Sequence, residues 1–167
     1  MKLRGLRGSV LEDMINRTIA DYRSKKLALI QKIPTPITPM AQDKEGHITR
    51  AFFEKKSTVD YIGLVQEIAV AFDAKESQTE KFPLKNIHEH QYQFMKEWEE
   101  QGGVAFLIIL FNKELVAYYM RFSELEKFWK KKIDFKLSDL DDNYKMNVRG
   151  KIKIDIISKL QLDIDSR

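Results

Sequence analysis

Cysteine is absent from the 167 residues of this chain. The chain therefore forms no disulfides, and it offers no thiolate ligands for zinc or iron–sulfur clusters and no cysteine nucleophile. Histidine is scarce as well, with only His47, His88 and His90. A bound metal ion would be held by carboxylates instead, which favours magnesium, manganese or calcium.

Long hydrophobic runs are missing too. The longest, from Val104 to Phe111, has 8 residues, whereas a transmembrane helix needs roughly 20. The basic N-terminus lacks the apolar stretch of a secretory signal. We therefore expect a cytosolic protein with no membrane partner. No P-loop, dinucleotide-binding glycine motif, Ser-His-Asp signature or zinc-ligand spacing occurs, which disfavours nucleotide-driven and nucleophilic enzymes.

The composition is that of a globular protein, with 43% hydrophobic and 32% charged residues. Its length predicts a single domain over residues 1–167, with its own hydrophobic core. The net charge of +4 permits an anionic partner without establishing one. Residues 1–33 hold eight Lys and Arg against three Asp and Glu, whereas residues 61–101 hold four against eight. This asymmetry suits a first helix that binds phosphates, but an ordinary solvated helix face is the more frequent cause of such a pattern.

Hydrophobic spacing predicts the elements of the first half. A capping-box pattern from Ser9 to Glu12 opens a helix over 9–24. Residues 27–33 predict a buried strand that ends in a proline-rich stretch. The polar stretch 39–51 is long for a connection, so it is either functional or disordered. Residues 57–64 and 67–75 predict a hairpin with a turn at 63–66, whose second strand ends in polar residues that point away from its apolar face.

The second half alternates helices and strands. A helix is predicted over 84–101, where Gln91 interrupts its apolar face and Gly102-Gly103 ends it. Strands at 104–111 and 114–120, a short helix at 122–130 and a last helix from about 155 follow. This order predicts the α/β or α+β class, with helices packed on a mixed sheet.

One carboxylate–lysine triplet has a suggestive context. Asp73-Ala74-Lys75 ends a strongly patterned strand, and the preceding strand carries Asp60 at a distance compatible with a hairpin. Two carboxylates on adjacent strands repel unless a divalent cation lies between them, and a nearby lysine can orient or deprotonate a water bound to that cation. The pattern fits phosphodiester hydrolysis. From spacing alone, a solvated strand end with a surface ion pair is the more frequent explanation of such a pattern.

Other candidate residues also have two explanations. Glu12 closes the capping box on Ser9, or it holds a metal-bound water over the sheet end. Gln91 on an apolar helix face needs a polar partner, which a nearby active site would supply. The aromatic and basic residues just before Asp60 either belong to the hydrophobic core or act as a wedge against unstacked bases. His88 and His90 point to different helix faces and make a poor metal pair, and the run 130–132 of three lysines is typical of a solvated face.

Five ordered blocks of the sequence resemble the RecU family of Holliday junction resolvases. The resemblance is strong from about Gly8 to Gln91 and looser beyond. The blocks are Gly8-x-x-Leu11-Glu12-Asp13, Lys32-Ile33-Pro34-Thr35-Pro36, Ser57-Thr58-Val59-Asp60-Tyr61, Phe72-Asp73-Ala74-Lys75-Glu76 and Phe82-Pro83-Leu84-x-Asn86-Ile87-His88-x-His90-Gln91. The resemblance implies a PD-(D/E)xK nuclease with a restriction-endonuclease-like fold, a homodimer that requires magnesium, with manganese as an alternative, and four-way junction DNA as substrate. It also implies a bacterial cytosolic or nucleoid location, and it suggests recombinase or branch-migration proteins as further partners.

The resemblance also assigns roles to residues. Asp60 and Asp73 would ligate magnesium, with the carbonyl of Ala74 as a further ligand. Lys75 would activate or orient the attacking water, Glu12 would support the metal shell and Gln91 would hydrogen-bond near the scissile phosphate. Residues 36–56 correspond to a projecting stalk that enters the junction centre. The DNA-binding residues implied are Arg7, Arg50, Phe53, Lys55 and Lys56.

Two departures from the family pattern affect these expectations. Asp73 stands where relatives usually carry Glu, which shortens the ligand by one methylene and changes the expected metal preference. The basic stretch before Gly8 is shorter than in bacterial members, which suggests lower DNA affinity and is compatible with a phage origin. Two alternatives stay open: a nuclease for other branched or mismatched DNA, and a junction-binding or strand-annealing protein whose carboxylates only hold structure.

Overall fold

A computed structural model describes residues 9–53 and 58–167, with Phe53 described in its backbone only. Its centre is a sheet of six strands in the order β1-β4-β5-β7-β8-β10. Only the pair β5 and β7 is parallel, and α2 makes the crossover between them. The sheet strands are β1 (Ala28–Lys32), β4 (Tyr61–Val65), β5 (Ile68–Ser77), β7 (Val104–Phe111), β8 (Val116–Arg121) and β10 (Lys145–Asn147). The predicted mixed sheet with flanking helices is confirmed.

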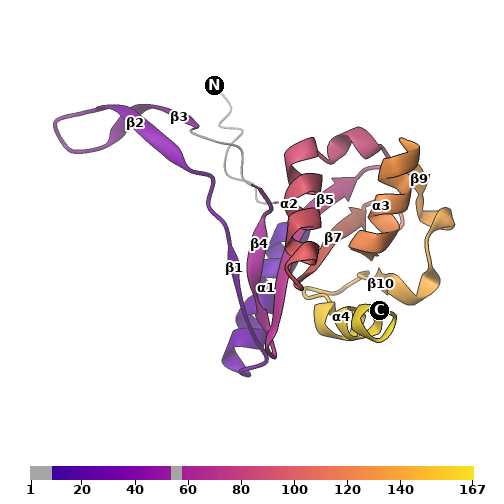
Figure 1. Ribbon diagram of the computed structural model, residues 1–167. Helices are drawn as coiled ribbons and strands as arrows, with labels where there is room; N and C mark the ends of the chain where they lie inside the picture. Colours follow the sequence, from indigo (N-terminus) through magenta and orange to yellow (C-terminus); the bar gives the residue numbers. More distant parts are fainter. Residues whose placement is uncertain (1–8, 54–57) are drawn as a thin grey trace.

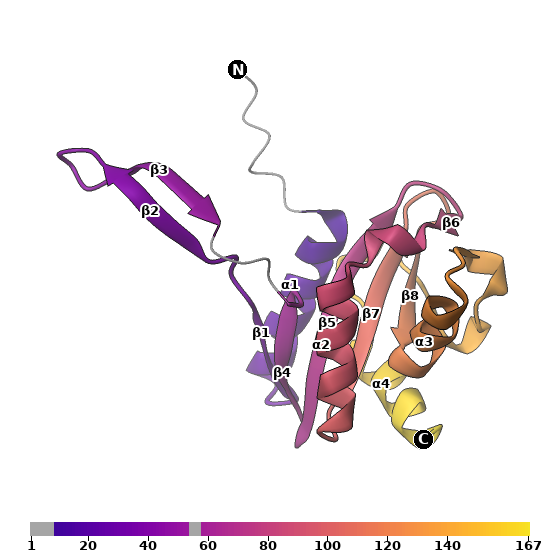
Figure 2. The same cartoon turned by 45° about the horizontal axis from the view of Figure 1, so that its top comes forward.

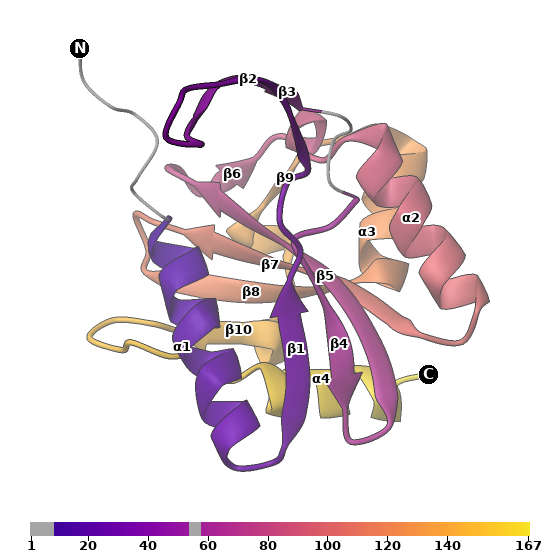
Figure 3. The same cartoon turned by 90° about the vertical axis from the view of Figure 1, so that its left-hand side faces the viewer.

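Helices cover both faces of this sheet, as Figures 1 and 3 show. On one face, α1 (Val10–Ser24) and α4 (Ile156–Asp165) cover a row of stacked rings from four strands. On the other face, α2 (Glu89–Glu100) lies beside α3 (Phe122–Lys131), and Tyr92 of α2 stacks on Trp129 of α3. The row of rings consists of Tyr61, Phe72, Phe106 and Tyr119. None of the helices in residues 9–53 and 58–167 has the length and apolar character to span a membrane.

Several predicted boundaries shift, each for a local reason. The helix expected over 84–101 begins only at Glu89, because Leu84–Asn86 form a 3-10 turn (η1) and His88 is extended as the N-cap of α2. The turn expected at 63–66 lies at Gln66 and Glu67, which both adopt positive φ. The strand expected from residue 114 begins at Val116, because Leu115 in the preceding turn also has positive φ. The helix over 9–24 is confirmed, with Ser9 accepting a hydrogen bond from the Glu12 N–H at 3.1 Å.

The long polar stretch is an ordered hairpin. Strands β2 (Ile37–Gln42) and β3 (Ile48–Phe53) pair with each other and with no other strand of the described chain. Figure 1 shows them extending well away from the sheet and its helices. The projecting stalk expected over 36–56 is present in residues 37–53 as this hairpin, and residues 54–56 lie outside the described residues.

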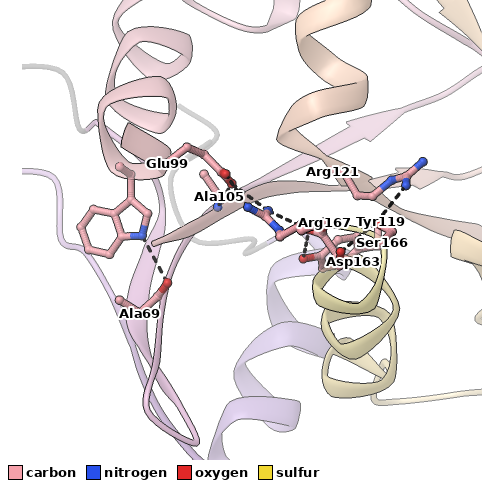
Figure 4. A network of polar contacts seen from close by, with 9 residues as sticks. Ala69, Glu99, Ala105, Tyr119, Arg121, Asp163, Ser166 and Arg167 are labelled. Carbon is pink, nitrogen blue, oxygen red and sulfur yellow. Dashed lines mark hydrogen bonds and ion pairs between the residues drawn. The ribbon is translucent and has the colours of Figure 1, made fainter. Parts of the chain in front are cut away.

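Two smaller features tie the remaining segments to the sheet. The short strands β6 (Lys81–Phe82) and β9 (Phe135–Lys136) pair with each other in a separate small sheet, and Figure 2 shows β6 beyond the end of β5. At the opposite end, Arg167 donates to Glu99 of α2 at 2.6 Å and to Asp163 of α4 at 3.3 Å (Figure 4). Asp163 also accepts a hydrogen bond from the buried Tyr119 hydroxyl at 3.0 Å. This network joins α2 and α4 across the edge of the sheet.

Candidate active site

Two aspartates from neighbouring strands meet at the open end of the β4–β5 hairpin. Asp60 directly precedes β4 and Asp73 lies within β5, and the pairing of Tyr61 with Phe72 places them opposite each other. The Asp60 N–H donates to Asp73 Oδ1 at 3.0 Å, and the Ala74 N–H donates to Asp60 Oδ2 at 3.0 Å. Each carboxylate is therefore fixed by a backbone group of the other's strand.

Lys75 and Gln91 complete this arrangement. The Lys75 Nζ lies 2.6 Å from Asp73 Oδ2, and Gln91 Nε2 donates to the same oxygen at 3.0 Å. The Gln91 Oε1 accepts from Lys75 Nζ and from the His88 N–H, each at 3.1 Å. Gln91 thus interrupts the apolar face of α2 because its amide is bonded to the Asp73–Lys75 pair.

The explanation of this pair as a solvated surface contact is wrong. Asp73 is fully buried, with 0% exposure, because α2 covers this face of β5. The pKa of Asp73 is raised to about 7, mainly by burial and also by the neighbouring Asp60, whereas the ammonium of Lys75 works in the opposite direction. Burial disfavours the charged form of a carboxylate, and a positive charge beside it favours that form.

The donor set fits a hard divalent cation. The N–H and carbonyl of one strand residue point to the same edge, so the Ala74 carbonyl faces the side on which its N–H meets Asp60. Two carboxylates and one backbone carbonyl are oxygen ligands of the type that magnesium prefers, and this ion usually takes only one or two carboxylates and keeps several waters. Asp60, Asp73 and Ala74 are therefore the residues that would hold it.

Glu12 lies near this group and is bonded elsewhere. Its carboxylate is 2.6 Å from the Lys32 Nζ, and its side chain is 29% exposed. Together with Asp60 and Asp73 it contributes to the raised pKa of Tyr61, whose main cause is burial. Glu12 belongs to α1, which covers the sheet face opposite to the one on which α2 buries Asp73, and its carboxylate is paired with a lysine. Its role in supporting a metal shell stays a prediction.

Glu76 contributes a link that the sequence analysis did not assign. Its Oε1 accepts from the Leu11 N–H in the first turn of α1 at 2.9 Å, and its Oε2 accepts from Asn112 at 3.1 Å. The residue therefore fixes the start of α1 against β5, one position after Lys75. The only sequence signal was its place within the Phe72–Glu76 block, because nothing local predicts that a helix N-terminus approaches it.

A different acidic cluster lies at the tip of the stalk. The ligand atoms of Asp43, Glu45 and His47 lie within 4.8 Å of one another, and all three residues are exposed. Asp43 Oδ1 accepts from the Glu45 and His47 N–H groups at 2.9 Å each, so the cluster is explained by turn hydrogen bonds. The cluster lies in the turn between β2 and β3 and includes none of the predicted metal ligands.

The predicted DNA-binding residues are distributed unevenly over the described chain. Arg50 is exposed on β3, and the backbone of Phe53 ends that strand. Arg7, Lys55 and Lys56 lie outside the described residues. The stalk thus places Arg50 and Phe53 on the strand that leads back toward Asp60.

Comparison with known proteins identifies relatives of this chain. A family model described as "Recombination protein U" (RecU) matches residues 6–162. The "Holliday junction resolvase RecU" of Leuconostoc mesenteroides is 42% identical over 132 residues, which is 76% of this chain and 65% of that protein. The protein of the same name from Pediococcus pentosaceus is 40% identical over 133 residues, or 77% and 66%.

Two further comparisons complete these findings. The "Holliday junction resolvase RecU" of Listeria welshimeri is 39% identical over 132 residues, so the match spans just under two thirds of these relatives' length, here 66%. A solved structure of Archaeoglobus fulgidus Hjc, a Holliday junction resolvase, covers 83% of this chain and 92% of its own with a TM-score of 0.37 at 8% identity. The family match extends over most of the sequence, so the chain belongs to the RecU family.

Proposed function

We propose that this chain is a divalent-metal-dependent endonuclease that resolves four-way DNA junctions by paired nicks, with magnesium as its ion. The observation that carries the proposal is the pair Asp60 and Asp73, each bonded to the other's strand, with Lys75 beside them. The names of the curated relatives supply the substrate class. The proposal treats residues 1–167 as one nuclease domain with the β2–β3 stalk as an insertion.

The chemistry follows from how these residues are held. The ion, when bound, stabilises the charge that develops on the phosphodiester as water attacks in line. Asp60 and Asp73 hold it through oxygen atoms, and the buried setting strengthens this attraction. Lys75 orients the attacking water, because Gln91 and Asp73 fix its ammonium group at one place. Gln91 has a second role in hydrogen-bonding near the scissile phosphate.

The stalk supplies the preference for a junction in this proposal. Each of its strands has six residues, which corresponds to about 20 Å at about 3.3 Å per residue. Residues 34–60 contain four basic and four acidic side chains, so attraction to DNA in bulk does not explain this segment. Insertion of the stalk at an open junction centre explains this segment, with Phe53 stacking on bases and Arg50, Lys55 and Lys56 contacting phosphates.

Paired nicks require two active sites, so the proposal includes a homodimer. Leu29 on the edge strand β1 is 57% exposed, and its pairing partner Leu64 on β4 is 52% exposed. Both lie on the face of the sheet opposite α1, because their neighbours Ala28 and Val65 are buried on the α1 side. A second copy of the chain would cover this apolar pair. Light scattering should report a dimer for the wild type and a monomer for Leu29→Glu.

Cleavage of a synthetic mobile four-way junction tests the function directly. The wild type with magnesium should nick opposing strands of the junction and leave linear duplex at the same concentration largely intact. Equal cutting of another branched DNA would indicate a nuclease of different specificity. Binding of the junction without cleavage in magnesium or manganese would indicate a non-catalytic accessory protein.

A further inference from the structure

Lysines gather beside the connection between β5 and α2. Residues 81–90 and 127–136 together contain seven lysines and two carboxylates, a net charge of +5, whereas the whole chain carries +4. These two short segments therefore account for the entire positive excess. They contain β6, η1 and the last part of α3, which lie close together in Figure 2.

The fold joins the two segments into one surface. Lys81 pairs with Lys136 across β6 and β9, and the Leu84 N–H donates to Asp134 Oδ1 at 3.0 Å. The stacked rings of Phe82 and Phe135, with centroids 5.2 Å apart, lie beneath this contact. We refer to the lysines held together here as the lysine cluster, which consists of Lys81, Lys85, Lys132 and Lys136.

Two members of the lysine cluster are already neutralised. Lys81 lies 2.8 Å from Asp134, and Lys136 lies 4.0 Å from Glu80. Among residues 9–53 and 58–167, neither Lys85 nor Lys132 forms an ion pair or a side-chain hydrogen bond. Lys85 adds only a weak attraction to Asp134, whose pKa is lowered mainly by its hydrogen bond to Lys81. Lys85 and Lys132 thus have charge available for an external anion.

Both of these lysines border the same hollow. It has a volume of about 210 Å³, and its lining includes Lys85, Lys132 and the indole of Trp129. The Trp129 ring is fixed by stacking on Tyr92 at 4.4 Å, so it offers a rigid apolar wall. The remaining lining residues are Leu84, Ile87 and Glu89. An apolar hollow with cationic sides suits a phosphate that is attached to a sugar.

A short segment of chain connects the hollow with the candidate active site. His88, whose N–H donates to Gln91, follows Lys85 by three residues. Three residues of extended chain are at most about 10 Å long. Successive nucleotides of one DNA strand rise by about 3.4 Å, so this length corresponds to about three nucleotides. A strand cut at the aspartate pair would therefore reach the hollow within a few nucleotides.

We propose that Lys85 and Lys132 bind one backbone phosphate of the DNA strand, a few nucleotides from the phosphate that is cut. This inference rests on the proposed nuclease function and adds a second, sequence-independent contact that holds the strand in place. The attached deoxyribose lies against Leu84 and Trp129. Glu89 is the one carboxylate in the lining, and it weakens the contact.

Lys132 makes a sharp test possible because of its backbone. It is the C-cap of α3 with φ of 54°, a left-handed conformation that favours glycine. Lys132→Gly therefore removes the ammonium group while the melting temperature stays equal or rises. A loss of DNA affinity in this variant cannot come from a weakened fold.

The experiment measures anisotropy of labelled four-way junction and linear duplex in calcium at several salt concentrations. Lys85→Ala and Lys132→Gly should each raise Kd by about threefold to tenfold and lower the slope of log Kd against log salt by about 1. Glu89→Gln should lower Kd. The control is Lys96→Ala, which removes a lysine from the far half of α2 and should leave Kd and slope unchanged.

The outcomes separate this inference from the proposed function. A wild type that neither binds nor cuts the junction overturns the function itself. A wild type that binds and cuts, with unchanged Kd and slope in both lysine variants, overturns the phosphate contact alone. An equal loss in Lys96→Ala also overturns it, because general charge would then explain the effect.

Discussion

Asp73→Asn is expected to stabilise the metal-free protein at pH 8, although it removes a proposed metal ligand. Burial raises the pKa of Asp73 from 3.8 to about 7. A carboxyl group whose pKa is higher in the folded than in the unfolded state destabilises the fold when it is ionised. Its effect lowers the free energy of unfolding from about pH 4 upward and reaches its full size above pH 7. This difference in pKa corresponds to about 4 kcal/mol. Asparagine has nearly the same shape and no charge, so it avoids that loss, and the hydrogen bonds that its NH2 group gives up by replacing one acceptor oxygen reduce the gain.

Urea unfolding in the presence of EDTA measures this effect. At pH 8 the variant should gain up to about 4 kcal/mol in unfolding free energy, whereas at pH 4.5 the two proteins should differ by about 1 kcal/mol. Added calcium should stabilise the wild type more than the variant, because only the wild type keeps both carboxylates. The exposed control Asp165→Asn should change stability by about 0.5 kcal/mol or less. A variant that is less stable than the wild type at pH 8 without metal would refute the reasoning.

Three further predictions concern catalysis, specificity and stability. Lys75→Ala should lower the single-turnover cleavage rate by about a hundredfold or more with little change in Kd, and a defect cured by more DNA would make Lys75 a phosphate contact instead. Phe53→Ala, or a Gly-Ser linker in place of residues 38–49, should reduce the preference for junction over duplex in competition binding at two salt concentrations, and an unchanged ratio would point to dimer geometry. Arg167→Ala leaves Asp163 buried without its ion pair, so chemical denaturation should show a loss of about 2–4 kcal/mol, whereas an unchanged unfolding midpoint would contradict the contact.

Strand alternation indicated that Asp60 and Asp73 approach each other, whereas their assignment as metal ligands came from the resemblance to the RecU family. Asp60 and Asp73 lie on neighbouring strands of one hairpin, and a period of two places them together once the pairing is correct. Gln91 was found because a polar side chain on an apolar helix face needs a partner. These inferences depend on local patterns, which is why they did not need the tertiary structure.

Other features depend on contacts between distant segments. The burial of Asp73 arises from the packing of α2, which starts 16 residues later. The Glu12–Lys32 pair and the Glu76–Leu11 bond join residues 20 and 65 positions apart. The hollow beside Lys85 and Lys132 requires β6 to pair with β9 across more than 50 residues. Hydrophobic periodicity in the sequence does not indicate that such distant segments are in contact.

The central claim is that Asp60 and Asp73 form a metal-dependent active site for junction cleavage. The measurement that tests it most directly is single-turnover cleavage of a mobile four-way junction with magnesium by the wild type, Asp60→Asn and Asp73→Asn, paired with junction binding in calcium. The wild type should cut, and both variants should bind the junction without cutting it. Cleavage by either variant at the wild-type rate would contradict the assignment of the site.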